Sequence, residues 1–264
     1  KQLFMSSRKK LNLDERQTND SIIKERKLSS IESIPEAKNE FLIKVWNQLS
    51  NTYFSKYQIQ QLSDQAKTIA SSEGKTSMLI KSRKNLIEIF IFTPNQPGLF
   101  FKTVQSFEHL SIETIDSDIH TTDDGLYALN TFICRHKILG GNLIQRDIQN
   151  IQKKIIAAID SENPKSVTKA KPKTKKVFEY QTKVHITDSS IKNISLITLE
   201  TLDKPNLLSE VAKIFLDHGV SIDSARITTL GEKVEDNFTV SDEKTKSAIS
   251  KNKAQQIQKK LKSL

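Results

Sequence analysis

Apolar residues recur at two different spacings along this chain, and these spacings predict its secondary structure. From residue 86 to 92, Ile and Phe occupy most positions, which predicts a strand buried on both faces. After a polar turn, apolar residues return at helical spacing from Leu99 to Leu110. Strand patterns follow over 112–121 and 126–135, and Asp124-Gly125 between them predicts a hairpin. A second helical stripe runs from Leu143 to Ile159.

The same order of elements returns later in the chain. LIEIFIFTPNQPGLF at 86–100 aligns with ISLITLETLDKPNLL at 194–208, which matches Thr93 to Thr201 and Pro97 to Pro205 at a constant interval of 108 residues. The second hairpin is two residues shorter, and a thin apolar stripe in 241–264 predicts a last helix. Each repeat therefore reads β-α-β-β-α.

The repeat pattern predicts an α+β fold with two tandem ferredoxin-like βαββαβ domains, each a four-stranded antiparallel sheet with helices on one face. Alternating apolar residues over 177–186 predict the closing strand of the first repeat. The second repeat has no such strand in this interpretation. We therefore expect another element to cover the open edge of its sheet.

The remaining segments divide the chain as follows. Residues 1–39 are expected to be a polar helix or linker after a missing catalytic region, and 40–85 a helical connecting segment. Two helical stripes, with a break near residues 55–57, are expected to pack on another domain, and 78–80 form a possible edge strand. The first domain is predicted over 86–187, including a basic linker at 161–176, and the second over 188–264.

Composition narrows the possible partners. The chain has 264 residues, a net charge of +10 and 36% hydrophobic residues. Such charge would suit nucleic acid, an anionic membrane or an acidic partner, but much of it lies in the linker 161–176, where no aromatic residues interleave. We therefore expect no specific nucleic-acid binding. No apolar run approaches the roughly 20 residues that span a bilayer, so no membrane association is expected.

The single cysteine, Cys134, excludes an intrachain disulfide and suits a reducing cytoplasm. We expect it to pack as a small hydrophobic side chain. No signal peptide is recognised, and because the chain starts at Lys1 we expect a fragment or a processed product.

No set of residues predicts catalysis. The five histidines have no partner at a metal-binding spacing, and no nucleophile-elbow, Walker or dinucleotide motif is present. Asp116 and Asp118 alternate on a predicted strand, and we interpret them as a solvated or interface face. We therefore expect no catalytic residue, no metal ligand and no cofactor in this chain.

The two strand-to-helix turns are the candidate sites. Backbone N–H groups at a helix N-terminus are unpaired and face a positive dipole end, so a small carboxylate can dock there. Gly98 allows close backbone approach, and Pro97 and Pro205 preset the first helical turn. A capped helix start without a ligand is the alternative for a single copy. Two copies favour a ligand-sensing or dimer-forming site.

These turns resemble those of a known family. TPNQPGLF at 93–100 and TLDKPNLL at 201–208 resemble turns of ACT domains, small regulatory modules that often bind amino acids. Over 40–264 the chain resembles the tandem C-terminal ACT domains of bifunctional uridylyltransferase/uridylyl-removing enzymes, most specifically in IDSARITTLGEKVEDNF. VWNQLSNTYFSKYQ at 45–58 resembles the segment that joins their HD domain to the ACT pair.

The resemblance implies a regulatory function. In that family a nucleotidyltransferase domain uses UTP to add UMP to the PII signalling protein, an HD domain removes it, and both require a divalent metal such as Mg²⁺. Neither catalytic motif occurs in this chain. The chain would then sense L-glutamine for its own catalytic domains. By this analogy the following residues face glutamine: Asn95, Gln96, Pro97, Gly98, Asp203, Lys204, Pro205 and Asn206. Asn206 stands where the family usually has glycine, so we expect the first turn to bind if only one does.

Two alternatives stay open. The ACT pair can be an interaction or homodimerisation module without a ligand, with Ser224 and Arg226 on a shared strand. It can also be the ACT region of another enzyme, such as a guanosine-tetraphosphate synthetase, against which the VEDNF stretch of the second repeat argues.

Overall fold

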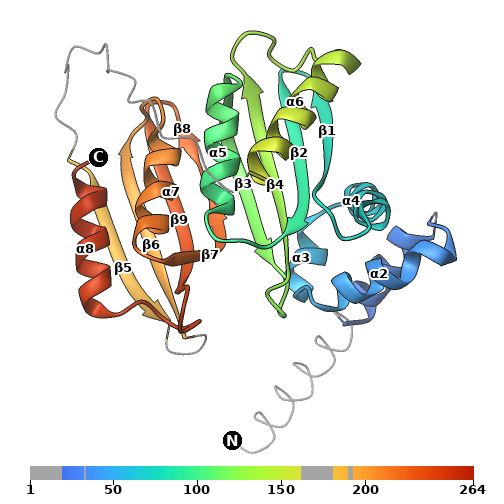
Figure 1. Cartoon of the computed structure of the whole chain (residues 1–264), viewed down its shortest axis with the longest axis horizontal. Helices are drawn as coiled ribbons and strands as arrows, with labels where there is room; N and C mark the ends of the chain where they lie inside the picture. Colours follow the sequence, from blue (N-terminus) through green and yellow to red (C-terminus); the bar gives the residue numbers. More distant parts are fainter. Residues whose placement is uncertain (1–19, 33, 162–180, 190–192) are drawn as a thin grey trace, which may run out of the picture.

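The computed structural model describes residues 20–32, 34–161, 181–189 and 193–264. Within these residues the chain forms two antiparallel sheets, each with a pair of helices on one face, and a helical segment on the other face of the first sheet (Figure 1). No helix in this described part is long and apolar enough to cross a bilayer.

The first domain has four strands in the order β1-β2-β4-β3. Its strands are β1 (Ser77–Arg83), β2 (Leu86–Pro94), β3 (Ile112–Thr121) and β4 (Tyr127–His136), and its helices are α5 (Leu99–His109) and α6 (Gln145–Ile159). The central strand β2 is buried along almost its whole length, as its continuous apolar run predicts. The predicted hairpin is confirmed, with Gly125 at φ 74° between β3 and β4.

The second domain repeats this arrangement in the order β5-β6-β9-β7. Its strands are β5 (Lys183–Ser189), β6 (Ile194–Leu202), β7 (Val220–Arg226) and β9 (Lys233–Asp242), with the short β8 (Thr229–Leu230) beside β9, and its helices are α7 (Leu207–Asp217) and α8 (Lys251–Lys262). Ile89 pairs with Phe132 and Ile197 with Phe238, so the second hairpin is two residues shorter, as predicted. The predicted α+β fold with two ferredoxin-like domains is confirmed.

Two strands lie in other positions than the sequence pattern predicts. The strand expected to close the first domain, β5, pairs with β6 of the second sheet, where Val184 lies opposite Leu199. Its place in the first sheet is taken by β1, which pairs with β2. Each domain therefore runs ββαββα along the chain, and the prediction that the second sheet lacks a fourth strand is wrong. Residues 177–180 of the expected strand lie outside the described residues.

A tight hairpin explains why β1 belongs to the first sheet. Arg83 pairs with Leu86, so only Lys84 and Asn85 join β1 to β2, and Lys84 has φ 53°. A two-residue turn of this kind matches the twist of the strands and closes a very short loop. The predicted boundary at residue 86 therefore separates β1 from its own sheet.

Several helix boundaries also differ from the prediction. The last helix starts at Lys251 rather than near residue 241, because Ser241 belongs to β9 and the Ser250 hydroxyl accepts a hydrogen bond from the Lys253 amide at 3.3 Å. Residues 36–72 form three helices where two were predicted: α2 (Glu36–Asn47), α3 (Asn51–Lys56) and α4 (Ile59–Ser72). Another helix covers 20–31. Residues 1–19 and the linker after 161 lie outside the described residues.

The helical segment packs on the first sheet, as predicted. Tyr53, Phe54 and Leu62 are fully buried in a cluster that includes Phe92 and Leu129 of the sheet. This cluster covers the sheet face opposite α5 and α6 (Figure 1). Burial of this apolar area stabilises the contact between the segment and the domain.

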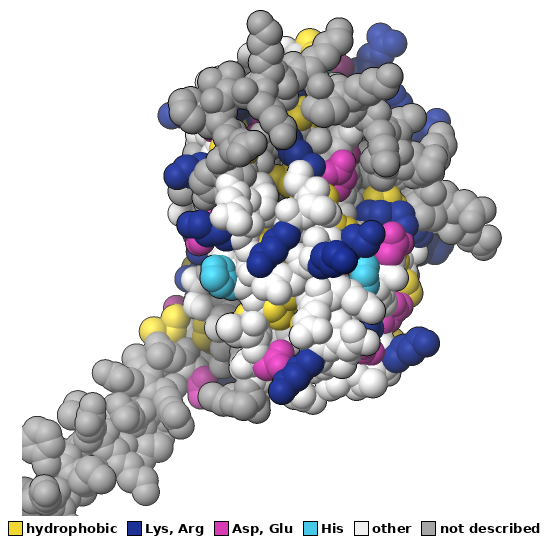
Figure 2. Space-filling model, turned by 90° about the vertical axis from the view of Figure 1, so that its left-hand side faces the viewer, with side chains coloured by type: hydrophobic (Ala, Val, Ile, Leu, Met, Phe, Trp, Pro, Cys, Tyr) yellow, Lys and Arg dark blue, Asp and Glu magenta, His cyan; other side chains and the backbone are white. Residues whose placement is uncertain are grey.

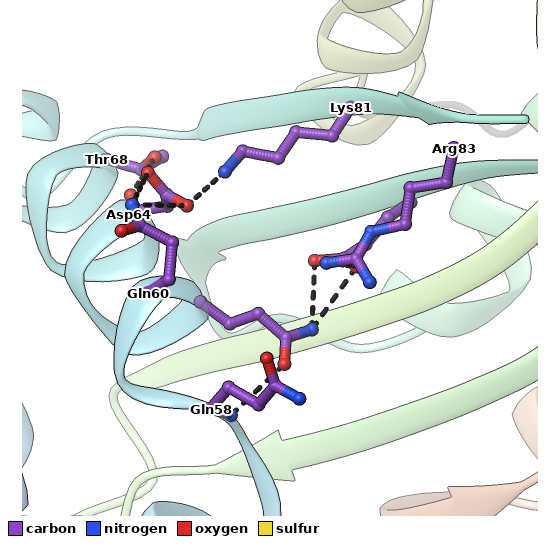
Figure 3. Close-up of polar contacts among 8 residues, drawn as sticks. Gln58, Gln60, Asp64, Thr68, Lys81 and Arg83 are labelled. Atoms are coloured by element: carbon purple, nitrogen blue, oxygen red, sulfur yellow. Dashed lines mark hydrogen bonds and ion pairs between the residues drawn. The ribbon is translucent and has the colours of Figure 1, made fainter.

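Polar contacts fix α4 in register on this face (Figure 3). The Gln61 amide donates to the Glu88 carboxylate at 3.3 and 3.4 Å, and Arg83 Nη2 lies 2.9 Å from Glu88 Oε2. Asp64 forms an ion pair with Lys81 of β1. Because Glu88 is buried, these partners compensate the loss of water around its charge.

The two domains pack side by side within one chain. The edge strand β3 lies beside β7, α5 contacts α7, and one hydrophobic cluster extends through both domains. Ser224 and Arg226 therefore lie on the strand at the contact between domains. The far side of the second domain, with α8 and β5, presents lysine and arginine side chains scattered among acidic, histidine and uncharged ones, and no continuous apolar patch on its described residues (Figure 2).

Candidate functional site

Two clefts lie where the domains meet, and each contains one of the two predicted turns. The first cleft, a cavity of ≈ 630 Å³, combines the turn Asn95–Gly98 with the C-terminal end of α7 and the start of β7 from the other domain. The second, ≈ 220 Å³, combines the turn Asp203–Asn206 with Glu108 of α5 and the start of β3. The clefts are related by the internal repeat, so each turn faces the opposite domain.

Left-handed backbone conformations shape both turns. Gly98 has φ 71° and Asn206 has φ 66°, and each directly precedes its helix. A β-carbon at Gly98 would lie 3.1 and 3.2 Å from the two methyl groups of Leu216 in the other domain. Glycine is therefore needed there both for the backbone angle and for the approach of α7. Asn is one of the few other residues that adopts this conformation readily, which explains how Asn206 preserves the turn.

The side chains of Gln96 and Lys204 bind the ends of helices in their own domains. Gln96 Nε2 donates to the Ile159 carbonyl at 3.0 Å, at the end of α6. Lys204 Nζ donates to the Leu264 carbonyl at 2.9 Å, just beyond α8, and to Glu210 at 2.7 Å. These contacts hold each turn in place. A ligand in the cleft would meet mainly the turn backbone and the side chains of other residues.

The neighbouring turn residues connect to the hairpins. Asn95 Nδ2 donates to the Gly125 carbonyl at 3.1 Å, and the Asn95 amide donates to the Leu126 carbonyl at 2.8 Å. The Asp203 amide makes the equivalent bond to the Glu232 carbonyl at 2.9 Å. All eight residues predicted from the resemblance thus line one of the two clefts. Whether they bind glutamine stays a prediction.

Two buried polar residues, which the sequence patterns did not single out, lie at equivalent positions of the two clefts. Asn130 pairs with Ile91 in the first sheet, and Asp236 pairs with Leu199 in the second. Each is 1% exposed, and the Oδ1 atom of each has no hydrogen-bond partner among the described residues. A buried acceptor without a partner is costly, so a ligand that donates a hydrogen bond in either cleft would relieve that cost. Asn130 interrupts a largely apolar strand, whereas Asp236 lies in a mostly polar one, so the pattern gave no signal for Asp236.

Both clefts are lined by carboxylates, and burial perturbs several of them. Burial, together with the nearby Asp203 carboxylate, raises the pKa of Asp236 to about 8, although a hydrogen bond from the Thr228 backbone opposes the change. Burial and the Glu113 carboxylate raise the pKa of Asp203. In the first cleft, burial raises the pKa of Asp223, whose Oδ1 accepts from Ser241 at 3.2 Å. Carboxylates in these clefts are therefore poorly solvated.

One hydrogen bond joins the domains beside the second cleft. The Ser209 hydroxyl of α7 donates to Glu108 Oε2 of α5 at 2.7 Å. Burial raises the pKa of Glu108, while the Ser209 bond lowers it. Because Glu108 and Ser209 belong to different domains, this bond responds to any change in how the domains pack.

A second polar network lies away from the clefts, between the helical segment and the first sheet. Asp118 accepts from the Tyr57 hydroxyl at 2.6 Å and lies 2.7 Å from Lys56 Nζ and 2.8 Å from His120 Nε2. These partners hold the pKa of Asp118 well below its usual range against the opposing effect of burial. Asp118 thus belongs to an interface face, as the sequence predicts.

The described side chains offer few groups for chemistry. No cluster of three or more His, Cys, Asp or Glu residues in the described part of the chain could hold a metal ion. Cys134 is fully buried in β4, and burial raises the pKa of its thiol, so it packs as the sequence predicts.

Comparison with known proteins finds relatives that share one enzyme name. No protein-family model matches the chain. The bifunctional uridylyltransferase/uridylyl-removing enzyme of Psychrobacter sp. (strain PRwf-1) is 26% identical over 265 residues, which cover 92% of this chain and 29% of the enzyme. The enzyme of the same name from Azotobacter vinelandii (strain DJ / ATCC BAA-1303) is 29% identical over 209 residues, 75% of this chain and 23% of the enzyme.

Among solved structures, the aspartate kinase from Synechocystis superposes with a TM-score of 0.39 and 13% identity, over 69% of this chain and 27% of that one. A TM-score this low carries no conclusion, and the fold assignment rests on the strand order given above. The sequence matches confirm the resemblance drawn from the two turns. The chain is a sequence relative of the bifunctional uridylyltransferase/uridylyl-removing enzymes, and it spans about three tenths of their length or less.

Proposed function

We propose that this chain is the regulatory, glutamine-sensing C-terminal part of a uridylyltransferase/uridylyl-removing enzyme that modifies the PII nitrogen-regulatory protein in the cytoplasm. The relatives carry that enzyme name over most of this chain. Transfer of UMP from UTP and its removal, both with a divalent metal such as Mg²⁺, would belong to the catalytic domains of the full-length enzyme. The observation that supports sensing best is a cleft between two domains with a buried, unpartnered acceptor, Asn130 Oδ1, on its wall.

The first cleft suits an amino acid better than the second. It is larger, and Gly98 adds no side chain at the helix start. The N-terminal end of α5 favours the ligand carboxylate, and Asn130 Oδ1 can accept a hydrogen bond from an ammonium or amide group. We propose Asn95, Gln96, Pro97 and Gly98 as the turn that faces L-glutamine.

A ligand in this cleft would contact both domains at once. A ligand shifts a conformational equilibrium only through its different affinity for the two states. Contacts to the turn of the first domain and to α7 and β7 of the second would favour one packing of the domain pair over others. The helical segment on the first sheet offers a route by which that change reaches the catalytic domains.

Calorimetric titration of the chain with L-glutamine tests this proposal. We expect saturable binding, absent with D-glutamine, and a loss of at least tenfold in affinity for Asn130→Ala. Asn252→Ala on the exposed face of α8 is the matched control and should bind as the unchanged chain does. No heat of binding at millimolar L-glutamine, or equal binding by Asn130→Ala, would overturn the proposal.

The second candidate function is an interaction module without a ligand. The packing of β3 beside β7 and of α5 on α7 within one chain favours it, because each domain covers an edge strand and a helix of the other without a ligand. Light scattering distinguishes a homodimerisation module, which forms dimers as concentration rises, from a sensor that stays monomeric. No observation favours the ACT region of a guanosine-tetraphosphate synthetase.

A further inference from the structure

The two clefts differ in charge at equivalent positions. The second cleft carries four carboxylates from both domains: Glu108, Glu113, Asp203 and Asp236. The internal repeat aligns these with Leu216, Ser221, Asn95 and Asn130 in turn, and all four of those uncharged residues line the first cleft. The carboxylates of the second cleft therefore stand at positions that are uncharged in the first cleft. The first cleft has four carboxylates of its own, at other positions: Asp123, Asp124, Asp223 and Glu243.

Asp236 makes the second cleft more than a cluster of acidic surface residues. Its side chain is 1% exposed, it lines the cleft, and its Oδ1 has no hydrogen-bond partner among the described residues. A buried carboxylate with one oxygen left without a donor is unfavourable unless it is protonated or compensated by a positive charge. An atom of this kind requires a donor, and the cleft has room for one.

The lysines of the second cleft do not supply that donor. Lys204 Nζ is held by Glu210 and by the Leu264 carbonyl, at the end of α8. Lys137 lowers the pKa of both Glu108 and Asp203, but not enough to offset burial and the neighbouring carboxylates. Glu113 has a distant partner, Arg135 Nη1, at 3.9 Å. The cleft therefore keeps an excess of negative charge.

We propose that the second cleft binds a small organic cation, a compound with a primary ammonium group that donates to Asp236 Oδ1 and lies near Asp203. The cavity of ≈ 220 Å³ is below the range of about 300–1,000 Å³ typical of pockets for drug-sized ligands, so the compound is small. The described carboxylates do not form a metal-binding group, which favours an organic ammonium over a metal ion. The two clefts would thus serve different ligands, and the second does not depend on glutamine binding in the first.

Binding of an ammonium group here has a proton signature. The Asp236 pKa of about 8 means that the carboxyl is mostly protonated at neutral pH. An ammonium ligand that stays charged needs the carboxylate form, so binding releases one proton to solvent. Affinity should therefore rise up to about tenfold per pH unit as the pH increases from 6 toward 8. The other groups that face Asp236 are Glu108, Glu113, Lys137, Asp203 and Lys204.

The test uses n-butylammonium chloride as the probe and 1-pentanol as its uncharged counterpart. In ¹⁵N-correlated NMR titrations of the whole chain at pH 6, 7 and 8, we expect saturable shifts around Asp203–Asn206 with the ammonium only, tighter at higher pH. Asp236→Asn, which reproduces the residue of the first cleft, should weaken binding at least tenfold and abolish its pH dependence. Asp217→Asn, at an exposed aspartate of α7, is the matched control and should bind as the unchanged chain does.

Three outcomes would overturn the proposal: no saturable shift, equal shifts with 1-pentanol, or an affinity that does not rise with pH. If Asp236→Asn does not fold, the pH dependence of n-butylammonium affinity in the unchanged chain still tests the proposal. The glutamine titration is independent, because it concerns the first cleft. Failure of glutamine binding with a positive ammonium titration would refute only the sensing proposal, and the reverse result would refute only this one.

Discussion

Replacement of Asp236 by asparagine should change how the stability of the chain depends on pH. The side chain is 1% exposed, and burial raises its pKa from the model-peptide value of 3.8 to about 8 in the folded state. Between these two values the folded state keeps a proton that the unfolded state has released. The free energy of unfolding therefore falls as pH rises, until the pH exceeds the folded-state pKa.

The expected magnitude follows from the pKa difference. Each pH unit inside this window changes the free energy of unfolding by about 1.4 kcal/mol, so an increase from pH 5 to pH 7 should remove about 2.7 kcal/mol. The amide side chain of Asp236→Asn cannot ionise, and the variant should lack this contribution. The free energy of unfolding of the variant, relative to that of the unchanged chain, should therefore increase as pH rises. This holds whichever of the two proteins is more stable at pH 5.

Urea unfolding of both proteins at pH 5, 6, 7 and 8, followed by circular dichroism, measures this difference. Titrating groups that do not contact Asp236 contribute to both proteins alike, so the quantity of interest is the difference between the two curves. Asp217→Asn serves as the control, because it removes one carboxylate from the exposed side of α7, where Asp217 pairs with Lys213. Curves of the unchanged chain and Asp236→Asn that run parallel from pH 5 to 8 would refute the raised pKa of the buried Asp236 carboxyl.

Three further substitutions test the structure around the clefts. Gly98→Ala should lower stability by about 1 kcal/mol or more, because φ is 71° and the new methyl would lie 3.1 Å from Leu216. In thermal melting, Gly98→Ala should cost less in a Leu216→Ala background than in the unchanged chain. Ser209→Ala should cost about 1.5–3 kcal/mol in urea unfolding, because Glu108 loses its donor from the other domain, and Ser209→Thr should retain most of it. Tyr57→Phe should cost about 1–3 kcal/mol and increase hydrogen exchange in α3 and α4; unchanged exchange would show that its hydroxyl does not hold the segment.

The internal repeat was the part of the fold that sequence patterns predicted best. The continuous apolar run of β2, the helical stripe of α5 and the Gly125 hairpin each follow from local periodicity and turn chemistry. Local patterns failed to predict which of the two sheets a strand joins. The segment of β5 alternates and that of β1 is a short apolar patch, and both lie next to polar stretches, so neither pattern could assign its strand to a sheet.

The candidate site was predicted only in part. The turns at Gly98 and Asn206 were recognisable because they recur with the same strand before them and the same helix after them. The burial of Asn130 and Asp236 was not recognisable, because a polar residue in a strand can face solvent as readily as a neighbouring domain.

The sequence by itself thus determined the repeated strand–turn–helix unit, the class of fold and the likeness to one family of enzymes, because these depend on residues close together in the chain. Only the tertiary structure decided which sheet holds β1 and which holds β5, since strand pairing is a contact between distant segments. It also decided that each turn faces the other domain, and that the two clefts differ in charge at equivalent positions. The free-energy cost of a buried charge depends on everything packed around it, and no local pattern contains that information.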